Sequence, residues 1–326
     1  MSDCSESELK TKTIDNEKID LVYLWVDGSD PKWREKKQKY SGEKELDKDA
    51  IADCRFIDYD ELKFSIRSAE KNLPWINKIY IVADEQIPKW LDLNNDRVQV
   101  VDLKEIVPAD KLPLFNSGAI EARLPFIPNL SEYFIYANDD MLFWNPADKD
   151  FFFDGERPIC RLGERIKKKR YKHLYGHFIF KSRNLVRDRF GVDTPFFPHH
   201  NADAYKKSTY INCIKEFQKE FDIMLNNRFR DFSDIQRMIV SYYAIAKNEG
   251  IPKNVTLSLF DKLMHKTPDS EYFNVTKRNI KKIRNSKAIL MCVNDSRKTT
   301  DEARSMMKNV LEEKFPNKSS FEKEEC

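Results

Sequence analysis

The chain has 326 residues, 40% of them hydrophobic and 12% aromatic, which is enough apolar material for one large or two modest cores. Its 57 Lys and Arg residues nearly balance 54 Asp and Glu residues, so the net charge of +3 gives no overall field of the kind that binds nucleic acid. The six cysteines form no Cys-x-x-Cys pair and no zinc-type spacing, which indicates reduced structural thiols.

The N-terminal residues 1–18 are polar and contain no apolar secretion-type segment, so they are predicted to be disordered. No apolar stretch approaches the ~18 residues that a membrane-spanning helix needs. We therefore expect a cytoplasmic protein, with peripheral contact to the inner membrane left open. The folded part is predicted to be one domain over 19–311, followed by a polar, frayed tail over 312–326.

The first predicted strand is 21–26, six consecutive apolar residues that indicate burial on both faces, as in a parallel sheet. The turn sequence Asp-Gly-Ser-Asp-Pro at 27–31 ends it. Residues 36–53 hold ten charged side chains and are expected to form a solvated connection. Apolar residues at 62, 66, 69 and 73 then repeat with helical spacing and predict a helix that ends before Pro74.

Three more strands are predicted at 78–84, 97–103 and 133–139, with a short helix broken by prolines over 117–130. The resulting order of strands and helices is typical of α/β proteins with a nucleotide-binding sheet. Ligands of such sheets bind beyond the carboxyl ends of the strands. Acidic residues stand at these ends, namely Asp27, Asp84, Asp102, Asp139 and Asp140.

The second half of the chain begins with a basic stretch. Residues 161–190 contain eleven Lys or Arg residues and two acidic ones. This pattern predicts either a groove for a polyanion or an anionic membrane surface, or a mobile solvated lid within 145–200. Residues 201–249 are expected to be largely helical, with Ser233 and Gln236 forming a capping box. A last buried strand is predicted at 287–296.

The adjacent carboxylates Asp139 and Asp140 need a partner, because charge is costly beside a core. A hard divalent cation would suit them, since it takes oxygen ligands and completes its shell with substrate phosphates. Successive strand residues point to opposite faces, so one aspartate is expected to hold the ion while the other bonds an amide or an arginine. The alternative is that both cap a turn, but Asp27 and Asp295 at other strand ends favour a metal–phosphate site.

Phosphate-binding cations and a base are also present as candidates. The planar guanidinium group of an arginine binds phosphate oxygens well, although a surface ion pair is the better explanation of each arginine taken alone. Arg123 is favoured because the Ser-Gly entry of its helix would offer free amides to an anion. His199 or His200 would act as a base near neutral pH, or would be a loop histidine bonded to a carbonyl. The candidate arginines are Arg55, Arg67, Arg123 and Arg230.

Long segments of the chain resemble the conserved regions of the Stealth family: IDLVYLWVDGSDP, RFIDYDELKFSIRSAEKNLPWINKIYIVADEQIPKWL, FNSGAIEARL with FIYANDDMLF, PHH with FRDFSDIQ, and CVND. The similarity covers 19–296. This family comprises bacterial capsule polysaccharide phosphotransferases and the lysosomal-enzyme N-acetylglucosamine-1-phosphotransferase. The resemblance implies a glycosyltransferase-A-like Rossmann core and transfer of a sugar 1-phosphate from a nucleotide sugar to an acceptor hydroxyl. It also implies release of a nucleoside monophosphate and a divalent cation, Mg²⁺ or Mn²⁺.

The resemblance assigns roles to particular residues. The donor, a nucleotide sugar such as a UDP-N-acetylhexosamine, is expected to meet Asp27, Asp30, Arg55, Glu121, Asn138 and Asn294. The metal ion is expected at Asp139, Asp140 and Asp295. The expected catalytic groups are His199 or His200, Arg123, Arg230 and Asp234. Because the chain lacks the accessory domains of eukaryotic members, a bacterial enzyme of capsule or exopolysaccharide synthesis is the better match.

Two other functions remain open. A metal-dependent glycosyltransferase would break the sugar–phosphate bond instead and would release a nucleoside diphosphate. A non-catalytic protein would bind polyanions through 161–190, with no need for a donor or a metal. No Walker A loop, GxGxxG or GxSxG motif occurs, which argues against P-loop NTPases, dinucleotide-binding dehydrogenases and α/β-hydrolases.

Overall fold

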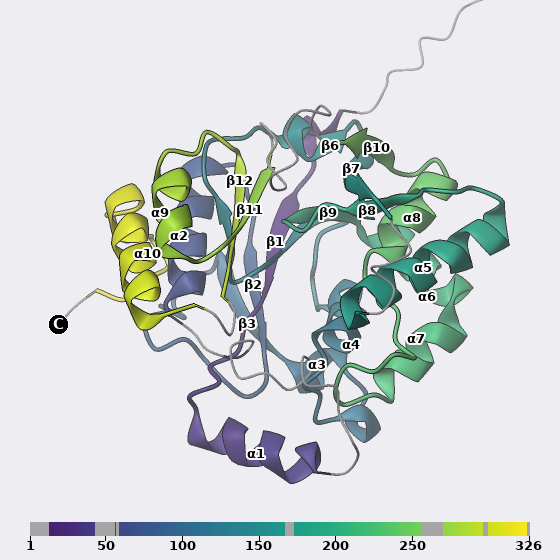
Figure 1. Cartoon of the computed structure of the whole chain (residues 1–326), viewed down its shortest axis with the longest axis horizontal. Coiled ribbons are helices and arrows are strands. Elements are labelled where there is room, and N and C mark those ends of the chain that lie inside the picture. Colours follow the sequence, from purple (N-terminus) through teal and green to yellow (C-terminus); the bar gives the residue numbers. More distant parts are fainter. Residues whose placement is uncertain are drawn as a thin grey trace, which may run out of the picture.

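The computed structural model describes residues 13–42, 56, 59–166, 173–255, 270–295 and 299–324, and a five-stranded sheet lies at its centre (Figure 1). The strand order is β3-β2-β1-β4-β9. The first four strands are mutually parallel and the fifth is antiparallel to its neighbour. The strands are β1 (Ile19–Leu24), β2 (Ile79–Ala83), β3 (Val98–Asp102), β4 (Tyr133–Asn138) and β9 (Asp203–Lys206).

The strands of the central sheet end together. Leu24 of β1 lies opposite Val82 of β2 and Asn138 of β4, and Ala83 lies opposite Asp102. The carboxyl ends of all four parallel strands therefore share one edge, as the strand-end acids predicted. The expected Rossmann-like α/β architecture, with its mostly parallel sheet, is confirmed.

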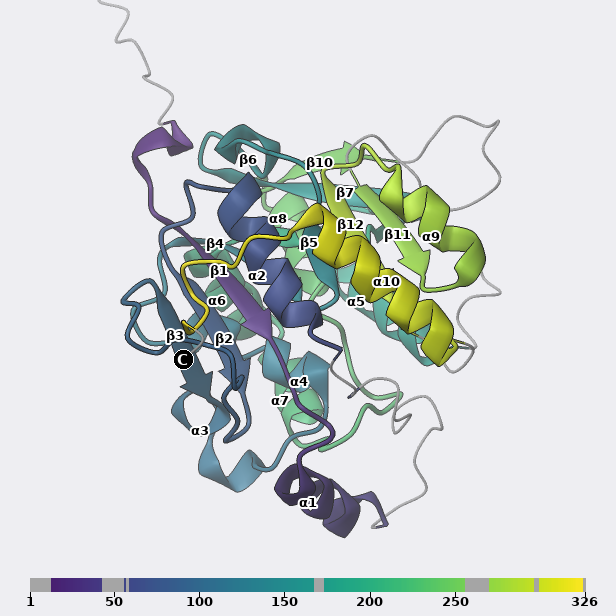
Figure 2. The same cartoon turned by 90° about the vertical axis from the view of Figure 1, so that its left-hand side faces the viewer.

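Helices cover both faces of this sheet, as predicted. Because successive strand residues point to opposite faces, Leu21 and Tyr23 belong to one apolar core and Val22 to the other. Figures 1 and 2 show α2 with α9 and α10 on one side and α5 to α8 on the other. The helices are α2 (Glu61–Asn72), α5 (Leu174–Phe190), α6 (Lys207–Glu216), α7 (Gln218–Leu225), α8 (Ile239–Ala246), α9 (Lys277–Arg284) and α10 (Asp301–Lys314).

Two smaller sheets flank the central one. One has the order β11-β12-β5, and the other has β10-β7-β6 with β8 paired to β7. A two-residue turn at Asp139-Asp140 joins β4 of the central sheet to β5, which pairs with β12. The two aspartates thus lie where two sheets meet. These strands are β5 (Met141–Phe143), β6 (Phe153–Asp154), β7 (Arg157–Arg165), β8 (Phe196–Pro198), β10 (Ile251–Asn254), β11 (Ser270–Asn274) and β12 (Leu290–Asn294).

Both ends of the described chain are more ordered than predicted. Residues Ile14–Asn16 form a 3-10 helix whose Ile14 is buried in a core. At the other end, Phe321 is 1% exposed, and Glu322 forms two hydrogen bonds with Arg67, at 2.7 and 2.6 Å. The prediction of a frayed tail is wrong, because one buried aromatic ring and one ion pair fasten the segment after α10.

We expect Phe321→Ala to lower the free energy of unfolding by about 3–5 kcal/mol, since a buried phenylalanine loses its transfer energy and leaves a cavity. Urea denaturation of the two proteins measures the difference. Glu324→Ala, at an exposed position three residues on, is the control. Equal stability of Phe321→Ala and the control would contradict the docked tail.

Two local predictions are corrected. Part of the expected solvated connection, 36–41, belongs to helix α1 (Pro31–Ser41), because Asp30 caps its first turn and Pro31 is its first residue. The helix expected to begin at Ser233 begins instead at Ile239, and Ser233 donates to Asp231 rather than forming a capping box.

The basic stretch folds as β7 and α5, apart from 167–172, which lie outside the described residues. Helix α5 packs on α8. Arginines of α5 are paired with carboxylates: Arg183 with Asp193, Arg187 with Asp188 and Arg189 with Glu216. This part of the stretch is therefore a packed helix and not a mobile lid, and its arginines already have anionic partners.

Candidate active site

A pocket opens at the carboxyl edge of the central sheet. Its walls come from the ends of β1, β2 and β4, from α3 (Leu103–Ile106) and α4 (Ser117–Glu121), and from the loop that carries Arg230. It encloses about 800 Å³, counted to its open mouth. Asp84, Ser117, Asn138, Asp139 and Arg230 supply its polar lining.

Aromatic side chains form one wall of the pocket: Trp25, Trp33, Phe56 and Phe115. The ring centroids of Trp33 and Phe115 are 5.6 Å apart, and those of Trp33 and Phe56 are 5.0 Å apart. Such a wall offers flat apolar surface to a nucleobase or a sugar face. Sequence reasoning missed it, although Asp30-Pro31 was a helix-start signal that would have placed Trp33 on a first turn above the pocket.

The loop after β1 supports this wall. Asp30 accepts hydrogen bonds from Lys32 N and Trp33 N, which lower the pKa of its carboxyl group. Asp27 Oδ1 accepts a hydrogen bond from the backbone N–H of Ser29, over 2.8 Å. A Cβ on Gly28 would lie 2.1 Å from the carbonyl oxygen of Phe56, so only glycine fits there. Asp27 and Asp30 thus shape the rim, and their contact with a donor stays a prediction.

Ion pairs connect helix α1 to the end of β2. Lys36 Nζ lies 3.1 Å from Asp84 Oδ2 and 2.9 Å from Glu85 Oε2. Burial raises the pKa of Asp84 and the Lys36 ammonium partly offsets this. Asp102 is likewise engaged, as the N-cap of α3 in a capping box with Glu105. Of the strand-end acids, Asp84 and Asp102 therefore serve mainly as structural partners.

Asp139 and Asp140 diverge, as strand alternation predicted. Asp139 lines the pocket. Asp140 donates its backbone N–H to Asp139 Oδ1, at 3.1 Å, and its carboxylate lies 3.5 Å from the thiol of Cys292 on β12. Asp139 is thus the carboxylate placed to meet a ligand.

Asn294, the last residue of β12, and Asp295, which follows it, do not line the pocket. Asp295 forms an ion pair with Arg304, at 3.0 Å, and Asn294 donates to Asn274 on the neighbouring strand, at 3.2 Å. The predicted role of Asp295 as a metal ligand is not supported by this arrangement, because its carboxylate pairs with Arg304 and it does not line the pocket.

The donor set for a metal ion is small. Within the described residues, no three His, Cys, Asp or Glu side chains gather as ligands. Mg²⁺ nevertheless needs only one or two carboxylates when water and substrate phosphates supply the remaining oxygens. Asp139, with Asp140 beside it, suits a Mg²⁺ ion that takes its other oxygen ligands from water and substrate. These two carboxylates are too few for a metal site built from protein ligands alone.

Two of the predicted arginines have different surroundings. Arg230 lines the pocket and donates to Ser117 Oγ at the start of α4. Burial lowers its pKa, and Glu121 opposes this effect.

Arg123 donates to the carbonyl of Ile106 and stacks on Phe126, with its guanidinium carbon 3.9 Å from the ring centroid. It lines a separate hollow beside α6 and α7, so its predicted role at the phosphates is not supported. Arg55 lies outside the described residues.

Asp234 holds the Arg230 loop against α4. Its carboxylate accepts from Asn116 Nδ2 at 2.8 Å, from Asn227 Nδ2 at 2.7 Å and from Asp231 N at 2.9 Å. It is 1% exposed, so it touches no substrate. The prediction of a catalytic Asp234 is corrected to a positioning role, because Asn116 is the N-cap of the helix that presents Ser117 to Arg230.

The pKa of Asp234 predicts a pH effect on stability. Burial raises this pKa from 3.8 to about 6, although its hydrogen bonds oppose the shift. The folded state therefore binds the proton more tightly than the unfolded state does. The stabilisation that results is fully present below pH ~4 and is lost as the pH rises to ~6. About two pH units correspond to about 3 kcal/mol. From pH 4 to pH 7, the free energy of unfolding of the wild type should therefore fall by this amount relative to that of Asp234→Asn, as measured in urea titrations. Parallel pH profiles would contradict it.

The histidine pair is divided by the backbone. His199 is 4% exposed and donates its backbone N–H to the carbonyl of Arg161, at 2.8 Å. His200 is half-buried, and its ring lies edge-on to Tyr175, with centroids 6.1 Å apart. Tyr175 itself is exposed. Neither His199 nor His200 is part of the pocket lining, so the role of either one as a base stays a prediction.

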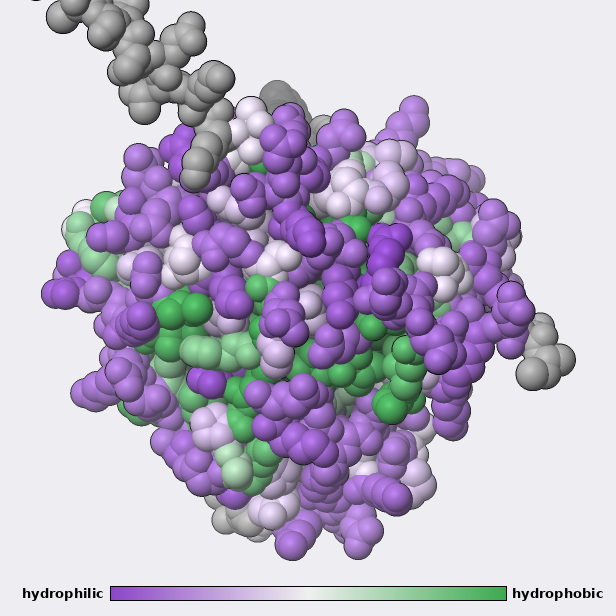
Figure 3. Space-filling model, turned by 180° about the vertical axis from the view of Figure 1, so that it is seen from behind, coloured by the Kyte–Doolittle hydropathy of each residue, from purple (hydrophilic) through white to green (hydrophobic). Residues whose placement is uncertain are grey.

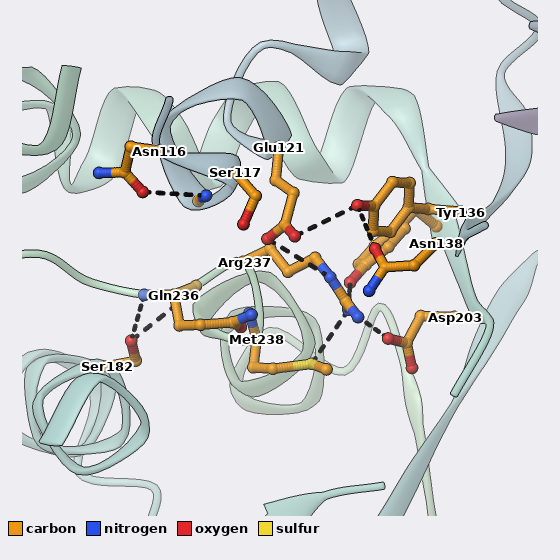
Figure 4. A network of polar contacts seen from close by, with 12 residues as sticks. Asn116, Ser117, Glu121, Tyr136, Asn138, Ser182, Asp203, Gln236, Arg237 and Met238 are labelled. Atoms are coloured by element: carbon orange, nitrogen blue, oxygen red, sulfur yellow. Dashed lines mark hydrogen bonds and ion pairs between the residues drawn. The ribbon is translucent and has the colours of Figure 1, made fainter. Parts of the chain in front are cut away.

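A buried charge network lies under the pocket (Figure 4). Arg237 donates to Asp203 and, at 3.1 Å, to the Tyr205 hydroxyl, and its Nε lies 3.5 Å from Glu121 Oε2. Burial raises the pKa values of Glu121 and Asp203. Glu121 does not line the pocket; it reaches Asn138 through Tyr136. Sequence reasoning missed Arg237, Asp203 and Tyr136, although a charge inside the apolar segment 235–246 was itself a signal of buried partners.

In the described part of the chain, no helix is both long and apolar enough to cross a membrane. Seen from behind, the molecule has an apolar band across its middle with hydrophilic residues above and below (Figure 3).

The fold and the pocket define a class, an α/β protein with a ligand site at the carboxyl edge of its sheet. Two family models match the sequence: Stealth protein conserved region 1 over residues 17–45 and conserved region 2 over 55–160. These regions contain β1 to β4 and all the strand ends of the pocket. Together with the relatives described next, they show that the chain belongs to the Stealth family.

The chain is similar to curated proteins over much of its length. It is 38% identical to the capsular polysaccharide phosphotransferase fcs1 of Haemophilus influenzae, over 67% of this chain and 62% of that protein. It is 30% identical to the exopolysaccharide phosphotransferase cps2G of Lactiplantibacillus plantarum, over 94% and 96%. It is 32% identical to the capsular polysaccharide phosphotransferase SacB of Neisseria meningitidis serogroup A, over 97% and 59%. The chain thus spans about six tenths of the Haemophilus and Neisseria proteins.

Among solved structures, the galactosyltransferase LgtC in complex with donor and acceptor sugar analogues matches with a TM-score of 0.44 and 10% identity. The match covers 92% of this chain and 98% of that one. At this level the similarity carries no argument about function.

Proposed function

We propose that this protein is a polysaccharide phosphotransferase that moves a sugar 1-phosphate from a nucleotide sugar to an acceptor hydroxyl and releases a nucleoside monophosphate. The names of its relatives support phosphotransfer in capsule or exopolysaccharide synthesis. One observation carries the proposal: a single pocket at the carboxyl edge holds Asp139, Asn138 and Arg230 together with an aromatic wall. These groups suit the phosphates and the base or sugar of such a donor.

In the reaction, the acceptor oxygen attacks the β-phosphorus, and the bond between this phosphorus and the bridging oxygen breaks. The transition state of phosphoryl transfer is stabilised mainly by positioning of the two reactants and by neutralisation of charge on the phosphoryl oxygens. Arg230, held by Ser117 and Asp234, would neutralise oxygens of the transferred phosphoryl group. His200 would accept the proton of the hydroxyl group, with its ring placed by Tyr175.

Asp139, with Asp140 beside it, would hold a divalent cation, Mg²⁺ or Mn²⁺, in contact with the diphosphate. The ion, when bound, would neutralise the charge that develops on the leaving nucleotide. We place the reaction in the cytoplasm, with UDP-N-acetylhexosamine as the donor to try first and a growing polysaccharide as the acceptor. Contact with a membrane through 161–190 is not part of the proposal, since arginines of α5 are paired.

Incubation with a panel of nucleotide sugars, Mg²⁺ and an oligosaccharide acceptor tests this function. The proposal predicts nucleoside monophosphate, formed in equal amount with a phosphodiester-linked product. Nucleoside diphosphate would identify a glycosyltransferase instead. Polymer binding that needs neither donor nor Mg²⁺, without turnover, would favour a polyanion-binding protein.

A further inference from the structure

The hydroxyl group of Tyr136 lies between two oxygen atoms under the pocket (Figure 4). Its oxygen is 2.7 Å from Asn138 Oδ1 and 3.2 Å from Glu121 Oε1. A phenol carries one hydrogen, so it donates to only one of these neighbours. The other contact needs a proton from the neighbour itself. Either Glu121 is a carboxylic acid, or Asn138 turns its amide nitrogen toward Tyr136.

The surroundings of Glu121 favour a proton on its carboxyl group. Glu121 is 4% exposed, and Arg237 approaches its Oε2 to 3.5 Å without forming a hydrogen bond. Instead, the guanidinium group donates to Asp203. Burial raises the pKa of Glu121, although Arg237 and Arg230 oppose this, because an ionised carboxylate whose Oε2 receives no hydrogen bond is costly in a core. Protonation of Glu121 removes that charge and leaves Arg237 with Asp203 as its counterion.

The other groups that face Glu121 do not reverse this balance. Arg230 is a cation that favours ionised Glu121, but its hydrogen bond goes to Ser117, and the effect of burial on the pKa of Glu121 is the larger one. Burial raises the pKa values of two facing tyrosines, so they remain neutral and add no charge. These are Tyr205 and Tyr210, the second of which donates to the backbone carbonyl of Glu121 at 3.0 Å.

We propose that Glu121 is a neutral carboxylic acid that donates to Tyr136, and that Tyr136 in turn donates to Asn138 Oδ1. This chain of donors fixes the direction of the Asn138 amide and presents Nδ2 to the pocket. Among the described residues, none accepts a hydrogen bond from Nδ2, and Asn138 lines the pocket. Glu121 and Tyr136 are therefore positioning residues, and Asn138 is the residue that meets the ligand.

The arrangement specifies what Asn138 recognises. An amide N–H binds an anionic or carbonyl oxygen and not a cation, so Asn138 is a ligand for an oxygen of the donor and not for Mg²⁺. That the oxygen belongs to a diphosphate rests on the proposed function. The protonation of Glu121 does not depend on the proposed function, because it follows from contacts within the protein.

Infrared difference spectroscopy of wild type minus Glu121→Gln, recorded without substrate at pH 7, tests the proton directly. We expect the carbonyl stretch of a protonated carboxyl group in the wild type, absent from the variant and shifted in Tyr136→Phe, where the acid loses its acceptor. A spectrum with an ionised carboxylate at Glu121 would overturn the proposal. This result would not bear on the reaction catalysed.

Kinetics of the same variants test the positioning. Tyr136→Phe breaks the chain and should lower kcat/KM for the nucleotide sugar by roughly 10–10²-fold, the value of a hydrogen bond to a charged group. In Glu121→Gln, an amide N–H replaces the acid O–H toward Tyr136, so the loss should be at least about tenfold smaller than in Tyr136→Phe. A loss in Glu121→Gln as large as in Tyr136→Phe would show that the carboxylate is needed in ionised form and would overturn the proposal.

Discussion

Arg230→Met is expected to lower kcat/KM for phosphotransfer by about 10³-fold while the protein stays folded. Removal of a fixed donor that stabilises transition-state charge typically costs about 10²–10³-fold, and removal of an arginine in phosphoryl transfer costs about 10³–10⁵-fold. Arg230 is the arginine that lines the pocket in the described structure, and Ser117 holds it in place. Methionine keeps the apolar stem, so packing changes little. Initial rates at varied donor concentration give the value.

Arg123→Met is the matched comparison for Arg230→Met. Arg123 stacks on Phe126 and lines a different hollow, so its loss should change kcat/KM by less than about threefold. Thermal unfolding of both variants checks that the fold is kept. If Arg123→Met is the inactive variant and Arg230→Met the active one, the placement of the phosphates in this pocket is wrong.

Asp139→Asn is expected to lower turnover by about 10²-fold or more and to raise the Mg²⁺ concentration needed for half-maximal rate. The amide keeps the shape of the side chain but removes the charge that would hold a divalent cation at the diphosphate. Asp139 is the carboxylate of the β4–β5 turn that lines the pocket. Rates measured over a range of Mg²⁺ concentrations separate loss of the ion from loss of the chemical step.

Asp295→Asn is the control for Asp139→Asn. Its carboxylate pairs with Arg304, so its replacement should lower stability slightly and leave the Mg²⁺ dependence unchanged. Unchanged turnover in Asp139→Asn, or a shifted Mg²⁺ dependence only in Asp295→Asn, would contradict the assignment of the metal end of the pocket.

The sheet was predictable from the sequence because parallel strands that are buried on both faces consist of uninterrupted apolar residues, as in 21–26 and 133–137. The acids that follow these runs marked the edge where the pocket lies. Strand alternation also predicted that Asp139 and Asp140 diverge at the β4–β5 turn, and the structure shows that Asp139 is the one that faces the pocket. Local pattern thus predicted the scaffold and the pair of carboxylates, but not which of the two lines the pocket.

The remaining site residues depend on contacts between distant segments, which local pattern does not contain. Asp295 ends a strand, but Arg304, nine residues later, captures its carboxylate. Arg123 follows α4 closely in sequence, but the helix ends at Glu121 and the guanidinium group turns to Ile106. The Glu121–Tyr136–Asn138 chain joins a helix to a strand. It is seen only when the two elements are packed together.

The most direct test of the central claim follows the β-phosphate of the donor. With a nucleotide sugar labelled with ³²P at that phosphate, the account predicts that the label appears in the acceptor product, in phosphodiester linkage, and that the released nucleotide is unlabelled. Label recovered in a nucleoside diphosphate, with an unlabelled glycosidic product, would contradict it.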